Sequence, residues 1–180
     1  MPRKKPVNIA LLGMGTIGSG VAKVLVGKTK TIARQAGSPV ALKMVVEKDK
    51  SRHGALGIDK SLFTTDYKKA IYSNDIDVII ELIGGEYPAY DYIKEALLNG
   101  KHVVTANKEV MAKHGAELLT IAHDHHAGLR FEASVGGGIP LIGPFQRDLV
   151  ANDIQAIYAI VNGTTNYILT RMAHDKIDFF

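Results

Sequence analysis

Short apolar runs alternate with longer amphipathic segments along most of the chain. Val7–Leu12 is apolar apart from Asn8, which is typical of a strand that is covered on both faces. The segment 17–36 then repeats apolar residues at helical spacing, and a Gly-Ser-Pro stop follows it. This alternation predicts βα units around a parallel sheet.

The same rhythm continues to about residue 133. The further predicted strands are Val40–Val46, Val78–Ile83, His102–Thr105 and Leu129–Ala133. Helices are expected between them at about 67–72, 90–98 and 108–123. Parallel strands separated by helices favour an α/β fold with a doubly wound parallel sheet of the Rossmann type.

The pattern changes after the glycine-rich segment 135–140. Ile154–Val161 is predicted to be a strand and Tyr167–Ala173 a helix, and neither completes a domain. We therefore expect a dinucleotide-binding domain over 1–147 and an incomplete, truncated start of an α+β substrate and dimerisation domain over 148–180. An apolar strand edge left uncovered favours self-association, so a homo-oligomer is expected.

The composition is that of a globular protein. Hydrophobic residues make up 46% and charged residues 22%, which argues against a disordered chain. There is no cysteine, which excludes disulfides and thiolate chemistry, and the small net charge of +4 does not indicate a nucleic-acid partner. The apolar run at the N-terminus breaks at Gly13, and no run is long enough to cross a membrane, so a cytoplasmic protein is expected.

The segment Gly13–Gly18 reads GMGTIG and matches G-x-G-x-x-G, directly after a predicted strand and at the start of a predicted helix. In this setting Gly13 permits the tight turn, Gly15 lets the backbone approach a pyrophosphate, and Gly18 lets the helix pack on the strand. The helix N-terminus then faces the phosphates. Such glycines also occur in turns without a ligand, but their placement here favours nucleotide binding.

Glu47 follows the second predicted strand, where an acidic residue binds the adenosine ribose in NAD-dependent proteins. It comes later in the chain than usual, and a long first helix would account for the delay. The basic residues nearby either hold a 2′-phosphate or belong to a solvated loop; they are Lys48, Lys50, Arg52 and His53. Glu47 favours NAD, but the nearby basic residues do not exclude NADP.

Ligands of doubly wound sheets bind beyond the carboxyl ends of the strands. Gly84 and Gly85 offer bare backbone at such an end, and Lys108 lies where it could contact a substrate oxygen, although most lysines are simply exposed. Glu132 precedes three consecutive glycines, which suit a sharp bend or a ligand. With the turning carbonyls, Glu132 could hold a hard monovalent cation.

Three stretches carry a specific resemblance: GKHVVTANK at 100–108, EASVGGGIP at 132–140 and NGTTNYIL at 162–169. In order and spacing they resemble the homoserine dehydrogenase family over nearly the whole chain. The resemblance implies an NAD(P)-dependent oxidoreductase that interconverts L-homoserine and L-aspartate 4-semialdehyde in threonine and methionine biosynthesis.

The resemblance also implies roles by position. It places cofactor contacts at Gly13, Gly15, Thr16, Ile17, Gly18, Thr105 and Lys108. Glu47 and Gly84, which follow predicted strands, are also expected to contact the cofactor. Lys108 is the expected catalytic residue. A sodium site would use Glu132 and the carbonyls of Val135, Gly137 and Ile139. Gly163 and Thr164 would begin the substrate pocket, although Thr164–Asn166 can also be read as the cap of the last helix.

Members of this family are much longer than 180 residues, and their remaining substrate-binding acids and second active-site lysine follow the segment that resembles 162–169. Residues 174–180 contain no counterpart of them. The alternative function is a nucleotide-binding module without dehydrogenase activity. A sugar dehydrogenase of similar N-terminal pattern is a third hypothesis, but it does not explain the SVGGGIP loop.

The first prediction is that the 180-residue chain binds NAD(H) but turns over homoserine slowly or not at all. Lys108 cannot both anchor the amino acid and handle its proton, and a general acid–base group contributes about 10²–10⁴ in rate. Homoserine-dependent NAD(P)H formation measures this, with Lys108→Ala as the control. A rate of about 10 s⁻¹ that disappears in the control would contradict the prediction.

Overall fold

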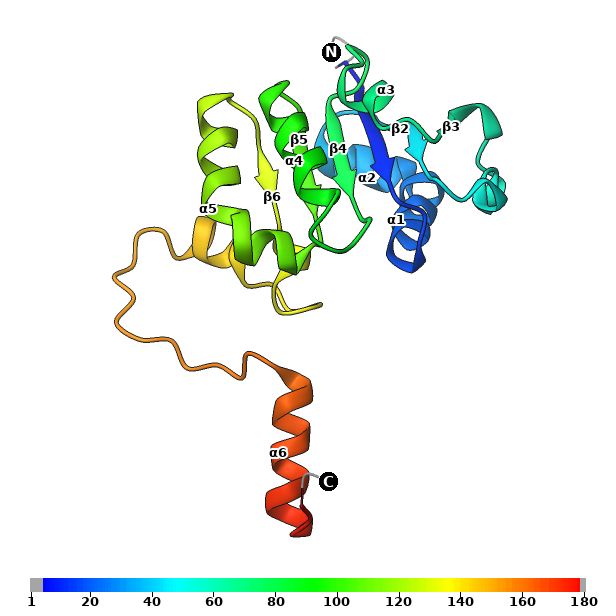
Figure 1. Cartoon of the computed structure of the whole chain (residues 1–180). Coiled ribbons are helices and arrows are strands. Elements are labelled where there is room, and N and C mark those ends of the chain that lie inside the picture. The colour runs from blue at the N-terminus through cyan, green and yellow to red at the C-terminus, as the bar shows by residue number, and fades with distance from the viewer. Residues whose placement is uncertain (1–4, 179–180) are drawn as a thin grey trace. The chain divides into compact units, whose positions relative to one another are not determined.

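The computed structural model describes residues 5–178, and the chain divides into two units, 1–138 and 139–180. The first unit is a six-stranded parallel sheet in the order β3-β2-β1-β4-β5-β6, with helices on both faces (Figure 1). Its strands are β1 (Val7–Leu12), β2 (Val40–Val46), β3 (Phe63–Thr64), β4 (Val78–Glu81), β5 (His102–Thr105) and β6 (Leu129–Arg130). The predicted doubly wound sheet is confirmed.

Two pairs of helices enclose this sheet. The pair α1 (Thr16–Gly27) and α2 (Thr29–Ala36) covers one face, and the pair α4 (Ala89–Leu98) and α5 (Lys108–Asp124) covers the other (Figure 1). A single turn, α3 (Lys68–Ile71), precedes β4 and packs on the α4 side. Within residues 5–178, no helix is both long and apolar enough to span a bilayer.

The core is split by the sheet into two layers, because successive side chains of a strand point to opposite faces. Ile9 and Leu11 of β1 belong to the cluster under α1, whereas Ala10 and Leu12 belong to the larger cluster under α4 and α5. Burial on both faces explains why the strand sequence is continuously apolar. It also fixes the carboxyl end of β1 in the middle of the sheet.

The predicted single helix over 17–36 is wrong, because the segment forms two helices that separate at Lys28. Lys28 has φ −116° and ψ 26°, outside the helical region. The Thr29 hydroxyl donates to the carbonyls of Leu25 and Val26 at 3.1 and 2.9 Å, which completes the last turn of α1. The helix pair therefore fills the interval before Glu47 that the long helix was expected to fill.

Strand ends also differ from the prediction. β4 ends at Glu81 because the N–H of Ile83 turns back to the Glu81 carboxylate, 2.7 Å away. β6 covers only two residues, and a 3₁₀ turn over Glu132–Ser134 follows it. The sixth strand, β3, is two residues long and too short to produce a recognisable apolar pattern.

In the second unit, the predicted strand over Ile154–Val161 is wrong. These residues form neither strand nor helix, and most of their apolar side chains are exposed, Tyr158 by 95%. A strand requires a hydrogen-bonded neighbour, and every strand among residues 5–178 belongs to the sheet of the first unit.

The predicted last helix is present and longer than expected, as α6 (Gly163–Asp175). Its cap is Asn162, whose Oδ1 accepts from the N–H of Thr165 at 2.9 Å, so Thr164–Asn166 lie in the first turn and do not cap it. A short π-helical turn over Pro144–Asp148 precedes it in this unit.

The second prediction concerns Gly18, where an added Cβ would overlap the carbonyl oxygen of Gly13. Gly18→Ala should lower the free energy of unfolding by about 3 kcal/mol, at the upper end of the range for an overpacked site. Gly20→Ala is the matched control in the same helix, because nothing lies within 4 Å of its Cβ. It should raise stability by about 0.4–1 kcal/mol. Denaturant unfolding measures both, and equal stabilities would show that Gly18 has no packing role.

Candidate functional site

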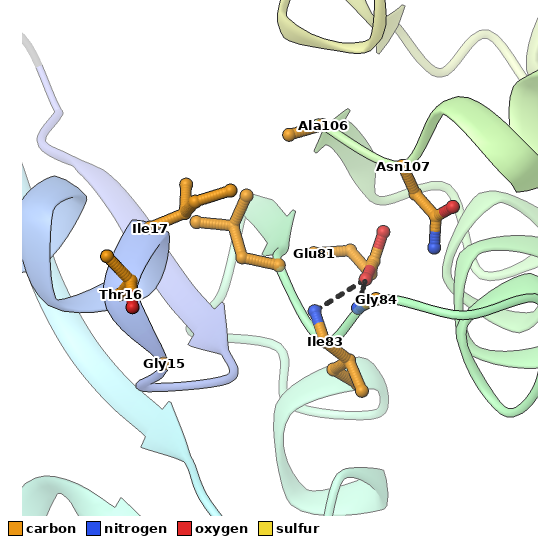
Figure 2. Close-up of a pocket in the computed structure, with 9 residues that line it drawn as sticks. Gly15, Thr16, Ile17, Glu81, Ile83, Gly84, Ala106 and Asn107 are labelled. Carbon is orange, nitrogen blue, oxygen red and sulfur yellow. Dashed lines mark hydrogen bonds between the residues drawn. The ribbon is translucent and has the colours of Figure 1, made fainter. Parts of the chain in front are cut away.

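A pocket of about 280 Å³ opens at the carboxyl ends of β1, β4 and β5. It is lined by Gly15, Thr16, Ile17, Glu81, Leu82, Ile83, Gly84, Ala106 and Asn107 (Figure 2). β1 and β4 are neighbours in the sheet, although β2 and β3 come between them in the chain. The pocket therefore lies at the point where the strand order reverses, which is where doubly wound sheets bind their ligands.

The turn after β1 forms one wall of the pocket. Gly13 has φ +97°, in the left-handed region, and an added Cβ would come within 2.8 Å of the Leu82 carbonyl oxygen. Its N–H donates to the carbonyl of Val46 at 2.9 Å. The predicted role of Gly13 in a tight turn thus has a backbone and a packing cause.

Gly15 is the N-cap of α1, and no side chain caps this helix end. An added Cβ on Gly15 would meet only the Nη1 atom of Arg52, at 3.9 Å. Thr16 and Ile17, both exposed, continue the wall in the first turn of α1 (Figure 2). The N–H groups of this turn and the positive end of the helix dipole border the pocket, as an anion site requires.

Glu47 follows β2 and is tied to the glycine turn. Its Oε2 accepts from the N–H of Met14 at 2.7 Å, and its Oε1 accepts from the N–H of Asp49 at 2.9 Å. The guanidinium of Arg52 donates to the Met14 carbonyl at 3.1 Å and lies 4.0 Å from Glu47 Oε2. Hydrogen bonds from Ser51 lower the pKa of Asp49. A carboxylate and a guanidinium therefore flank the same turn.

A smaller cavity of about 90 Å³ lies beside the glycine turn. It is lined by Gly13, Val46, Lys48, Thr65, Tyr67, Ile83, Pro88 and Tyr92. The rings of Tyr67 and Tyr92 stack with their centroids 3.8 Å apart. Ile83 lines both cavities, so the two adjoin at the loop that follows β4.

A buried polar network joins the ends of β4 and β5. Glu81 Oε2 accepts from the Thr105 hydroxyl at 2.6 Å, and Thr105 Oγ1 accepts from the N–H of Asn107 at 2.9 Å. Asn107 Nδ2 donates to the Gly85 carbonyl at 2.7 Å. Thr105 is only 1% exposed and lies behind the pocket wall, whereas Glu81 and Asn107 line the pocket.

The far end of the same loop is anchored to α5. The carboxylate of Glu86 accepts from Lys113 and lies 2.8 Å from His114 Nε2. A hydrogen bond from Lys113 and, to a smaller extent, one from His114 lower the pKa of Glu86. Glu81 and Glu86 thus hold the two ends of the loop that carries Gly84.

Lys108 is the first residue of α5 and is exposed. The helix is capped by Asn107, whose Oδ1 accepts from the N–H of Val110 at 3.1 Å. Among residues 5–178, no hydrogen bond or ion pair engages the Lys108 side chain, and it does not line the pocket. A cation is unfavourable at a helix N-terminus, so neither capping nor packing accounts for a lysine here.

The predicted cation ligands follow β6. The backbone oxygen of Glu132 accepts from the N–H of Val135 at 3.1 Å. Gly136 and Gly137 have φ +69° and +61°, so the chain reverses sharply after Val135. The remaining predicted ligand, Ile139, belongs to the second unit.

The predicted substrate residues Gly163 and Thr164 also belong to the second unit. Both are exposed in the first turn of α6. The structure thus brings the predicted residues of the glycine turn together with Gly84 within the first unit.

Two polar residues of the pocket, Glu81 and Asn107, were not predicted from the sequence. Glu81 ends the otherwise apolar strand VIIE. An acidic residue at a buried strand position is rare, so the sequence alone could have marked Glu81 as a candidate site residue. Asn107 directly precedes a helical pattern, where asparagine is a strong cap. Neither residue stands out by motif, because each also bonds to a partner that is distant in the sequence, Glu81 to Thr105 and Asn107 to Gly85.

Comparisons with known proteins agree with this geometry. The model of the homoserine dehydrogenase NAD binding domain matches residues 13–132, and that of homoserine dehydrogenase itself matches residues 140–180. Homoserine dehydrogenase of Bacillus subtilis is 42% identical over 172 residues, which cover 96% of this chain and 40% of the relative. That of Synechocystis is 40% identical over 177 residues, with the same shares covered.

Solved structures of homoserine dehydrogenases are also similar to this chain. The homoserine dehydrogenase of Thiobacillus denitrificans matches with a TM-score of 0.85 and 38% identity, over 96% of this chain and 40% of that one. A hyperthermophilic archaeal homoserine dehydrogenase in complex with NADPH matches with a TM-score of 0.76 and 26% identity, over 96% and 58%.

This chain therefore spans about 40% of the length of the curated relatives named above. Within that span the two family models match consecutive parts of the chain and the solved structures share its fold, so the resemblance in the sequence is confirmed. The chain belongs to the homoserine dehydrogenase family and contains its NAD-binding domain.

Proposed function

We propose that this chain is the cofactor-binding part of an enzyme that interconverts L-homoserine and L-aspartate 4-semialdehyde with NAD or NADP. Family membership supports this proposal, and the main structural observation in its favour is the open space beside Gly15. The fold requires glycine at positions 13 and 18, but it leaves the space beside Gly15 open. A glycine that the protein does not need for its own packing, at the mouth of a pocket, is explained by a ligand that approaches the backbone.

The residues present fit a dinucleotide. The pyrophosphate would lie against Gly15, Thr16 and Ile17, where uncapped N–H groups and the helix dipole favour negative charge. Glu47 has acceptor capacity left on both oxygens, which suits the ribose hydroxyls. The smaller cavity beside Tyr67 would take the adenosine end.

The nicotinamide half would then lie towards Gly84 and the end of β5, near Ala106, Asn107 and the buried Thr105. When bound, the cofactor supplies the hydride chemistry, and the protein binds and orients it. Lys108 would donate a hydrogen bond to a cofactor or substrate oxygen, which gives a purpose to a cation at an unfavourable helix position. Gly163 and Thr164 would begin the substrate pocket of the whole enzyme.

A sodium ion at Glu132, Val135, Gly137 and Ile139 remains a proposal drawn from the family resemblance. Among residues 5–178, no cluster of three His, Cys, Asp or Glu side chains could hold a metal ion. A cation after β6 would therefore depend on Glu132 and on backbone carbonyls. The sharp reversal at Gly136 and Gly137 supports such a site.

Self-association is likewise proposed. Most apolar side chains of residues 154–161 are exposed in the described part of the chain, and a second copy of the chain could cover them.

The third prediction is that Gly15→Val abolishes NAD(H) binding while the chain stays folded. The valine would occupy the space where the pyrophosphate lies, but it would meet no backbone atom of the protein within 4 Å of its Cβ. Gly20→Val is the matched control and should keep its affinity, because Gly20 lies in the same helix with open space around it. Calorimetric titration with NADH measures both, and an unchanged affinity of Gly15→Val would refute the site.

The fourth prediction concerns cofactor choice. Because a carboxylate and a 2′-phosphate repel each other, Glu47 should make NAD bind more tightly than NADP. Glu47→Gln should narrow that preference, and Arg52→Ala should weaken NADP more than NAD. The dissociation constants of NAD and NADP, measured for the unmodified chain, Glu47→Gln and Arg52→Ala, test this prediction. Tighter binding of NADP by the unmodified chain would assign the ribose end to Lys48, Lys50 or Arg52 instead.

A further inference from the structure

Glu81 is a fully buried carboxylate at the end of β4, with no exposed surface. Its Oε1 accepts from the N–H of Ile83 at 2.7 Å and from the N–H of Gly84 at 3.4 Å, as the dashed lines in Figure 2 show. Its Oε2 accepts from the hydroxyl of Thr105 at 2.6 Å. All three partners donate to it, which suits an ionised carboxylate.

No cation in the described part of the chain forms an ion pair with Glu81. Among residues 5–178, no lysine, arginine or histidine lies within ion-pair distance of Glu81. A buried carboxylate is costly unless it is paired, and three hydrogen bonds replace only part of its hydration. A structural anchor for the loop could be built from neutral groups, so the charge itself needs an explanation.

The position of Glu81 supplies one. It lines the same pocket as Gly84, Ala106 and Asn107, where the nicotinamide half of the cofactor would lie (Figure 2). The oxidised nicotinamide ring carries a positive charge, whereas the reduced ring is neutral. The phosphates carry the same charge in both forms, so Arg52 and other cations beside them act on both forms alike.

We propose that the buried carboxylate of Glu81 raises the affinity of this pocket for the oxidised cofactor relative to its affinity for the reduced cofactor. The inference rests on the proposed function and concerns the balance between the two redox forms. Burial strengthens the effect, because an opposite charge in a low-dielectric pocket is screened much less than one at the surface. A single charge at this depth should change the ratio of affinities by about fivefold or more.

The test measures the dissociation constants of NAD⁺ and NADH for the full chain and for Glu81→Gln, which removes the charge and keeps the shape. The expected result is that Glu81→Gln weakens NAD⁺ by about fivefold or more relative to NADH. A purely structural role would instead weaken both forms by the same factor. That outcome would overturn the inference and leave the proposed function standing.

Thr105→Val is the matched control within the same network. It removes the hydroxyl that donates to Glu81 and accepts from the N–H of Asn107 but keeps the charge, so it should change both affinities by similar factors. If Glu81→Gln does not fold, the same substitution is made in the Gly20→Ala background, which should raise stability because nothing lies within 4 Å of an added Cβ at Gly20. It should show the same selective loss of NAD⁺ affinity, and an unchanged ratio would overturn the inference.

If the full chain binds neither NAD⁺ nor NADH, the proposed function fails, and the inference that rests on it fails too. If the chain binds both forms, the ratio in the variants decides the role of Glu81 alone.

Discussion

The register of the parallel sheet is the constraint on which the site depends. Val46, Leu12, Glu81 and Thr105 pair side by side across β2, β1, β4 and β5. Because the strands are parallel, everything that follows these four residues emerges at the same edge of the sheet. The glycine turn, Glu47, the loop with Gly84 and the cap Asn107 therefore meet, although they are far apart in the sequence.

That register also explains why a carboxylate can be buried in the apolar sheet. Glu81 is directly opposite Thr105, so the hydroxyl reaches it without distortion, and the chain turns back after Glu81 to donate backbone N–H groups. The side-chain oxygens of Glu81 and Thr105 are thereby hydrogen-bonded, which is the condition for keeping a polar network in a core. The network makes the loop after β4 and the start of α5 one connected wall.

Local patterns in the sequence were sufficient for the fold and for four of the nine residues that line the pocket. The apolar strands, the glycine turn and the helix after Asn107 are each encoded by neighbouring residues, and these predictions are confirmed by the sheet and by the family. The contact of Glu81 with Thr105 spans 24 residues and becomes visible only once the register is known. The break at Lys28 depended on one hydroxyl, Thr29, that ends α1. The segment 154–161 has the composition of a strand but no neighbour to pair with, and pattern alone does not supply a neighbour.

The three glycines of the motif are not equivalent, and the difference decides what such a motif can mean. Gly13 and Gly18 are required by the close approach of β1, α1 and the Leu82 carbonyl, so they would be needed in the same fold without any ligand. Only Gly15 is free of such a requirement. A match to the motif is therefore evidence mainly for the strand, turn and helix, and the evidence for a bound phosphate lies in the one glycine that packing leaves unexplained. By the same reasoning, the charge of Glu81 points to a ligand because the packing of the loop would not demand it.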